Sequence, residues 1–275
     1  MTTDSAFPTV EQRLPEMMEF ASGLADDYES GNLQSWQELG GRVKAFFSPE
    51  MLDKVDAVAP GWRAMSAHGD GVTLVHILCA FIGLLVRPEY KRAGPVQQEL
   101  SKWIVLFHDI AKQVREGKPD RIHAFRSAAM AGAALPGLGF AVAADYGRHC
   151  DAWIRLVNTA TVNHGSTADL IQDNRKLPEI VDGIGRLFGR GTPAALIVKG
   201  VLFHMSINLI EEYPTPAPLT DFELGQYFNS ELLALQKLMS LADSDGWELF
   251  RPISRDNYRQ QTLAVFGKLE SLVNG

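Results

Sequence analysis

Cysteine is scarce in this sequence, because only Cys79 and Cys150 occur among 275 residues. Neither has a second cysteine at CxxC spacing, which excludes the ligand pattern of a cysteine-bound zinc site or a dithiol redox centre. Two isolated cysteines also offer little basis for a disulfide framework, as is usual in a reducing compartment. We therefore expect a cytoplasmic protein.

Positive charge is also in short supply. The chain has 26 Lys and Arg against 33 Asp and Glu, giving a formal net charge of −7. A general nucleic-acid binder usually presents a clustered basic face to neutralise phosphates. This balance disfavours long nucleic acid as a partner and favours a small substrate.

Long uninterrupted apolar runs are missing as well. The run Val72 to Val86 is short for a bilayer and carries His76 near its centre. The stretch 128–144 is interrupted by Pro136 and two glycines, and the first twenty residues include acidic side chains that a signal peptide would not have. We expect a soluble protein with no membrane partner and no export signal.

Apolar residues are abundant, at 46%, and most recur at three- and four-residue spacing, as in ELSKWIVLFHDIAKQV and SELLALQKLMSLA. This period predicts an all-α fold. Residues 211–223, which contain three prolines, should form a loop that ends in an N-cap at Thr220 or Asp221. The ranges expected to be helical after residue 60 are 72–86, 97–115, 121–135, 137–146, 150–163, 178–188, 192–211, 221–244 and 255–273.

A Pro-Gly break follows Ala59 and suggests a domain boundary. Residues 10–58 should form two or three helices of an N-terminal extension, 1–60. The main helical domain would then cover residues 61–275.

The most informative segment is WIVLFHDIAK, in which an apolar helix presents His108 and Asp109, followed by Lys112. A buried carboxylate without a partner is costly, and a bound metal would remove that cost. Imidazole and carboxylate are common ligands of catalytic divalent metals. Consecutive helical residues point about 100° apart, so other helices must supply further ligands.

Two other polar residues could complete a four-ligand set. His76 lies on the preceding apolar helix, which a short connection makes a neighbour in a bundle. Asp243 lies in LMSLADSDGW, at the end of an amphipathic helix. Asp245 is an alternative to Asp243 as the last ligand.

These residues resemble the ordered signature of the HD-domain superfamily of metal-dependent phosphohydrolases: a His, then His-Asp, then a distant Asp. His76, the pair in LFHDIAK and Asp243 in LAD occupy those places, and HDIAK is similar to the family's HDxxK pattern. The resemblance covers roughly residues 72–247. It implies an HD-domain-like helical bundle in which His76, His108, Asp109 and Asp243 bind one metal.

The resemblance also implies a second metal, because many relatives add two later histidines. His123 in IHAFRSA and His164 in VNHGS would fill these positions, with Asp109 as a bridge. His204 could have a structural role or join the site. One or two divalent ions are implied, and Fe, Mn, Ni, Co, Zn and Mg all suit these ligand types.

The function expected from the resemblance is hydrolysis of a nucleotide or other small phosphoester by a metal-activated water. Asp109 and Lys112 would act in catalysis, and Lys112 and Arg126 would bind the substrate's phosphate. Two alternatives stay open: an HD-type di-iron oxygenase, and a non-catalytic HD-like signalling or binding module. A homodimer is also left open.

Each of these residues also has a purely structural interpretation. His76 could be a hydrogen-bonded core histidine, and Asp109 could simply pair with Lys112. His164 could interact with a helix C-terminus, and Arg126 could form a surface salt bridge. The case for a site depends on the ordered set and not on any single residue.

Overall fold

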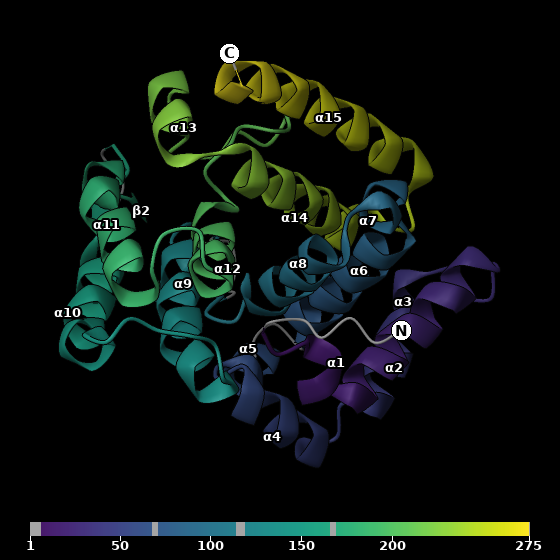
Figure 1. The fold of residues 1–275 in the computed structure, drawn as a ribbon. Coiled ribbons are helices and arrows are strands. Elements are labelled where there is room, and N and C mark those ends of the chain that lie inside the picture. The colour runs from purple at the N-terminus through teal and green to yellow at the C-terminus, as the bar shows by residue number, and fades with distance from the viewer. Residues whose placement is uncertain (1–6, 68–70, 114–118, 166–168, 275) are drawn as a thin grey trace.

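A computed structural model describes residues 7–67, 71–113, 119–165 and 169–274 of the chain. Helices make up most of these residues, which confirms the expected all-α fold (Figure 1). The β structure of the described part is one antiparallel pair of short strands, in which Val162 faces Ile171. Nothing in the sequence period had indicated this pair.

The elements follow one another along the chain with short connections. The first five helices are α1 (Val10–Arg13), α2 (Pro15–Glu29), α3 (Trp36–Phe46), α4 (Pro49–Val58) and α5 (Trp62–Ser66). The middle of the chain forms α6 (Val72–Val86), α7 (Pro88–Arg92), α8 (Pro95–Phe107), α9 (His123–Ala134), the 3-10 helix η2 (Leu135–Leu138), α10 (Tyr146–Thr159), β1 (Thr161–Asn163), β2 (Leu170–Gln172) and the 3-10 helix η3 (Asn174–Lys176). The last helices are α11 (Leu177–Phe188), α12 (Pro193–Phe203), α13 (Asp221–Tyr227), α14 (Ser230–Glu248) and α15 (Pro252–Asn274).

Helix α6 lies at the centre of the molecule. It is apolar on all sides, and its residues from Thr73 to Leu84 are buried, as expected for a helix enclosed by others. Helices α14, α2, α8, α3 and α5 pack around it. Figure 1 shows α6 and α8 side by side under α14, with α9 and α12 adjoining them. None of the helices in the described ranges is both long and apolar enough to cross a bilayer.

The N-terminal extension is packed onto this core. Helices α2 and α3 contact α6, and α1 contacts α8. The Val10 backbone N–H donates to Oε1 of Glu99, a buried carboxylate that also pairs with Lys102. The extension forms four helices where we expected two or three, since Leu14 separates the short α1 from α2.

Several helix boundaries were predicted well. Helix α6 spans the expected 72–86, and Thr220 caps α13 with a capping box closed by Glu223. Glu223 accepts from the Thr220 backbone N–H, and the Thr220 side chain accepts from the Glu223 N–H, so both ends of the box are formed.

Other boundaries were wrong for local physical reasons. Helix α8 ends at Phe107 rather than 115. The expected helix 137–146 is instead a Pro136-initiated 3-10 turn that Gly139 closes at φ 93°, followed by an irregular segment. The ranges 150–163 and 192–211 end early, at Thr159 and Phe203. Residues 221–244 form two helices because the Asn229 side chain caps a new one.

Candidate metal centre

Two triads of potential metal ligands lie next to each other in the core. His76, His108 and Asp243 form the first triad, and Asp109, His123 and His204 form the second. Within each triad the ligand atoms lie within 4.8 Å of one another. These residues come from α6, the end of α8, α14, α9 and the end of α12, so five helices meet here.

Asp109 joins the two triads. Its Oδ2 lies 3.4 Å from Nε2 of His76 and 3.6 Å from Nε2 of His108. Its Oδ1 lies 2.9 Å from Nε2 of His123 and 3.8 Å from Nε2 of His204. The two carboxylate oxygens therefore face opposite triads, as a bridging ligand would.

The histidine rings are oriented by the backbone. In three of the four rings Nδ1 lies within hydrogen-bond distance of the carbonyl three residues earlier: His108 on Val105 at 2.8 Å, His123 on Asp120 at 2.6 Å and His204 on Val201 at 2.7 Å. A carbonyl oxygen can only accept, so Nδ1 carries the proton and Nε2 keeps a lone pair. Such a second hydrogen bond is the usual support of a metal-binding histidine.

These lone pairs point at one another. Nε2 of His123 lies 3.1 Å from Nε2 of His204, and Nε2 of His108 lies 3.4 Å from Nε2 of His76. When both rings of the first pair are neutral, no proton lies between their nitrogens, so they cannot form a hydrogen bond. A cation held between these nitrogens and the Asp109 carboxylate would satisfy them, and Asp109 Oδ1 and His76 Nδ1 are also buried without a hydrogen bond. The residues present therefore fit a metal at each triad.

The same four residues, Val-Leu-Phe-His, end both α8 and α12, at 105–108 and at 201–204. In each helix the Phe is the last helical residue and the His follows as C-cap. The buried Phe fixes the helix end in the core, and the ring of the following His turns back onto the Val carbonyl. Repetition of this tetrapeptide is the signal that could have identified His204 from the sequence.

Close packing of α6 against α14 places His76 beside Asp243, with Nε2 3.0 Å from Oδ1. Two glycines allow this approach. A Cβ on Gly246 would lie 2.3 Å from Cε1 of His76, and a Cβ on Gly83 would lie 2.4 Å from Cβ of Asp245. No side chain fits at either position unless the helices separate.

Burial and mutual contact set the charge state of the cluster. Burial alone would raise the pKa of Asp109, but Lys112 and the nearby histidines hold that pKa well below its usual range. Burial likewise opposes ionisation of Asp243, yet its contact with His76 lowers the pKa. Burial lowers the pKa of His204 to about 3 and also lowers that of His108. Ionised carboxylates and neutral imidazoles are the forms that bind metals.

Lys112 lies in this site as expected. Its Nζ is 2.7 Å from Oδ2 of Asp109 and 5.3 Å from the centre of the Trp247 ring. Burial lowers the pKa of Lys112, but Asp109 and Asp243 more than offset that effect, so its pKa is raised and the ammonium stays charged.

Arg126 is engaged elsewhere. Its Nη2 pairs with Asp120 and donates to the Ala111 carbonyl at 3.2 Å. Asp120 in turn provides the carbonyl that orients His123. The geometry makes Arg126 a support of the His123 loop, and its contact with phosphate stays a prediction.

The structure does not bring His164 to the cluster. This residue follows β1, is exposed, and its backbone N–H bonds to the Asp169 carbonyl. His204 occupies the place that we assigned to His164. The helix expected over 150–163 ends early, and the strand that follows carries His164 away from the core.

Asp243, not Asp245, is the α14 carboxylate of the first triad. Asp245 points to the opposite side, where its Oδ1 lies 2.5 Å from Nη2 of Arg87. Burial raises the pKa of Asp245 although Arg87 counters it. The alternation follows from helical geometry, because two residues separated by one position lie on opposite faces.

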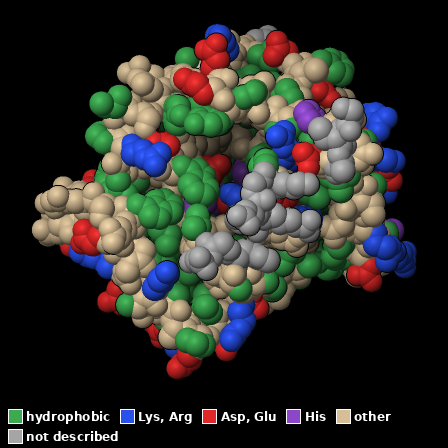
Figure 2. All heavy atoms as spheres, turned by 180° about the vertical axis from the view of Figure 1, so that it is seen from behind, with side chains coloured by type: hydrophobic (Ala, Val, Ile, Leu, Met, Phe, Trp, Pro, Cys, Tyr) green, Lys and Arg blue, Asp and Glu red, His purple; other side chains and the backbone are tan. Residues whose placement is uncertain are grey.

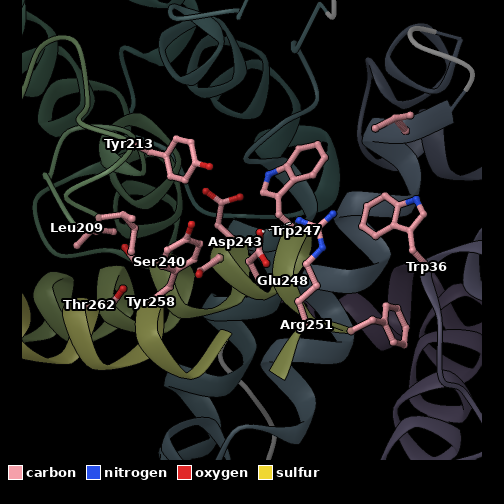
Figure 3. A pocket seen from close by; sticks show the side chains of 14 residues that line it. Trp36, Leu209, Tyr213, Ser240, Asp243, Trp247, Glu248, Arg251, Tyr258 and Thr262 are labelled. Atoms are coloured by element: carbon pink, nitrogen blue, oxygen red, sulfur yellow. Dashed lines mark hydrogen bonds and ion pairs between the residues drawn. The ribbon is translucent and has the colours of Figure 1, made fainter. Parts of the chain in front are cut away.

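A cavity of about 730 Å³ adjoins the first triad, and Asp243 is part of its lining. Figure 2 shows a hollow on one face of the molecule, where hydrophobic side chains surround acidic and histidine side chains. Figure 3 shows Asp243 together with Tyr213, Trp247 and Trp36 around the cavity. Sequence reasoning missed these aromatic residues, because they come from three separate segments.

Trp247 links the cavity to the cluster. Its ring stacks on the His76 ring with centroids 4.3 Å apart, and on Trp36 of α3 at 5.9 Å.

Comparison of the chain with protein-family models, with curated proteins and with solved structures finds no match.

Proposed function

We propose that this protein is a metal-dependent phosphohydrolase of the HD type. The observation that carries the proposal is the pair of His/Asp triads in the core, with Asp109 of the second triad also lying beside His76 of the first. The ordered set His76, His108-Asp109 and Asp243 fits the HD signature on which the proposal rests, and His123 with His204 extends that set to two ions.

His76, His108 and Asp243 would hold one ion, His123 and His204 the other, and Asp109 would contact both. The bound metals would supply an activated water and polarise a phosphoryl oxygen. The identity of the metal is left to experiment, since imidazole and carboxylate suit iron, manganese, nickel, cobalt, zinc and magnesium.

The chain's own residues have further roles. Lys112 holds Asp109 in position and places a permanent cation beside the first triad, where it can neutralise a phosphate oxygen. Trp247 covers His76 and limits access of bulk water to that ring. Asp243 is the one member of the triads with substantial exposure, at 31% of its side chain, and it faces the cavity from which a substrate would arrive.

We propose a small phosphoester, such as a nucleotide, as the substrate class. The cavity is of the size that takes one small ligand. A continuous basic face for long nucleic acid is not expected at a net charge of −7.

A di-iron oxygenase is the second candidate, and the four histidines of the two triads favour it, because a ligand set rich in imidazole suits iron. The two candidates differ in their need for oxygen. Turnover of a phosphoester under nitrogen with manganese supports the hydrolase, whereas substrate-dependent oxygen consumption by the iron-loaded protein supports the oxygenase.

The proposal is tested with Asp109→Ala, compared with Asp151→Ala, which removes an exposed carboxylate from α10. Metal content is measured by elemental mass spectrometry after loading with manganese, and activity is measured on bis(p-nitrophenyl) phosphate and a nucleotide panel. We expect two ions per chain and hydrolysis in the wild type and in Asp151→Ala. Asp109→Ala should lose the bound ions and the hydrolytic activity while its circular dichroism spectrum is unchanged. Failure of the wild type to bind metal after reconstitution would overturn the proposal.

A further inference from the structure

The cavity beside the first triad has features that define the organic part of a substrate. Asp243 belongs both to the cavity and to the triad, where its Oδ1 lies 3.0 Å from Nε2 of His76. A molecule in the cavity would therefore reach the metal centre with one end only. The rest of that molecule would contact the remaining lining.

Aromatic rings form the walls. Trp36, Tyr213, Trp247 and Tyr258 all line the cavity, and Figure 3 shows the Asp243 carboxylate between the labelled rings of Tyr213 and Trp247. Trp247 is 43% exposed and Tyr213 is 71% exposed, so large apolar faces are open to a ligand. Rings of this kind gain most from stacking or edge contact with another flat group.

Two hydroxyl groups lie in the cavity lining without a hydrogen-bond partner. Ser240 of α14 is 4% exposed and Thr262 of α15 is fully buried, and neither Oγ of Ser240 nor Oγ1 of Thr262 has a bond to the protein. A buried hydroxyl without a partner is costly, so such groups normally meet a ligand or water. Both residues line the cavity and can donate to or accept from a neutral group.

The charges around the cavity limit the ligand's charge. Among the described lining residues, Arg251 is the only cation, and it is 74% exposed and pairs with Glu248. Asp243 and Glu248 also line the cavity, so the wall is net acidic. Lys112 lies near the triads, with its Nζ 5.3 Å from the centre of the Trp247 ring and 2.7 Å from Oδ2 of Asp109. This arrangement suits one anionic group at the metal centre and disfavours further phosphates in the cavity.

We infer that this cavity binds the leaving group of the substrate, and that this group is a flat, uncharged ring system whose polar substituent bonds to Ser240 and Thr262. The inference rests on the proposed function for the reaction itself but not for binding of the ring. Hydrolysis would break the P–O bond of a single phosphoryl group, transfer that group to water and release the ring as its alcohol.

Binding is tested first, without any turnover, by isothermal titration calorimetry of the manganese-loaded protein with 2-naphthol, a neutral flat ring bearing one hydroxyl. We expect saturable binding, weakened at least tenfold in the variant Ser240→Ala/Thr262→Val. The matched control Thr159→Val/Ser271→Ala removes two exposed helical hydroxyls that bond only to their own helix, and it should bind like the wild type. Absence of 2-naphthol binding, or equal binding by both double variants, would overturn the inference.

Turnover is tested next with 2-naphthyl phosphate, 7-hydroxy-2-naphthyl phosphate, glycerol phosphate and ATP. The expected order of kcat/KM has the hydroxynaphthyl ester first, with ATP and glycerol phosphate at least tenfold lower. Ser240→Ala/Thr262→Val should remove the advantage of the hydroxynaphthyl ester through KM, with unchanged metal content. Preference for ATP or glycerol phosphate would contradict the inference. Binding of 2-naphthol without hydrolysis of any ester would instead refute the phosphohydrolase and leave the ring site standing.

Discussion

His204 completes the second triad, in the place for which His164 was predicted. We predict that His204→Ala binds one manganese ion per chain instead of two, because His123 and Asp109 alone leave the second ion under-coordinated. His164→Ala is the natural control, since that side chain is exposed and lies outside both triads. Metal content by elemental mass spectrometry after gel filtration measures the difference. Loss of an ion from His164→Ala would show that the assignment is wrong.

For single residues, the sequence was informative where they match an ordered motif. His76, His108, Asp109, His123 and Asp243 were predicted as ligands and all lie in the two triads. His164 was placed by the family resemblance at the end of an expected helix, and that helix ends early, at Thr159. The exposure of a single ring depends on the direction in which the chain turns, which no local pattern reports.

Acid should destabilise the metal-free protein through its neutral histidines. Burial lowers the pKa of His204 to about 3, whereas the unfolded chain has an ordinary histidine pKa of about 6.5. Between these values the unfolded state binds more protons, so stability is fully present above the unfolded pKa and falls as pH decreases. Lowering the pH from 7 to 5.5 should therefore cost about 1 kcal/mol from His204 alone, and His108 acts in the same direction.

Urea unfolding of the metal-free protein at the two pH values measures this loss. The variant His204→Asn removes the titrating group, so its stability should depend less steeply on pH. An equal pH dependence in both proteins would mean that His204 is already protonated or exposed in the folded state.

Among the elements, the crossing of α6 and α14 determines whether the first triad forms. We predict that Gly246→Ala weakens metal binding at this triad at least tenfold, because the added methyl would overlap the His76 ring. We also expect the variant to be less stable by about 1–3 kcal/mol, as is usual for overpacking. The control is Gly23→Ala, in which the new methyl meets nothing within 4 Å.

Gly23 is an exposed position inside α2, so its replacement by Ala should raise stability by about 0.5–1 kcal/mol. Manganese titrations and thermal unfolding of both variants give the two readouts. Unchanged manganese affinity in Gly246→Ala would mean that the two helices can separate without moving His76.

Helix existence was predictable here, but helix ends were less so. The bounds of α6 were predictable because Gly71 and the Arg87-Pro88 pair flank an unbroken apolar run. The ends of α8 and α12 were not, because in both a buried histidine side chain, rather than a Gly or Pro, marks the end. The Pro136 turn replaced the expected helix 137–146 because Gly139 adopts a left-handed conformation at φ 93°, which ends the turn after Leu138.

For the molecule as a whole, bound metal should stabilise the folded state. A ligand present at 100 times its Kd that binds only the folded state adds about 2.7 kcal/mol, which raises the Tm of a chain of this size by roughly 5 °C. We therefore predict that removal of metal by a chelator lowers the Tm by this amount, and that manganese restores it. Asp109→Ala should show no shift. Differential scanning calorimetry is the measurement, and an identical Tm with and without metal in the wild type would count against a buried ion.

The all-α architecture followed from the period of apolar residues, whereas the cavity did not. Its lining combines Trp36 of α3, Tyr213 of the proline-rich loop and Trp247 of α14. Most of the chain separates Trp36 from Trp247, so only the packed fold brings these residues together. The domain boundary near residue 60 stays a prediction, although α2 and α3 pack tightly on α6.

The position of Trp36 has a consequence for how such a protein can diversify. The His/Asp triads lie entirely after residue 71, whereas Trp36 of the N-terminal extension is part of the cavity lining. If the proposed function holds, one recognition residue, Trp36, is thus encoded far from the triads. A change within residues 1–60 could retune the choice of substrate while the residues that carry out the reaction stay the same.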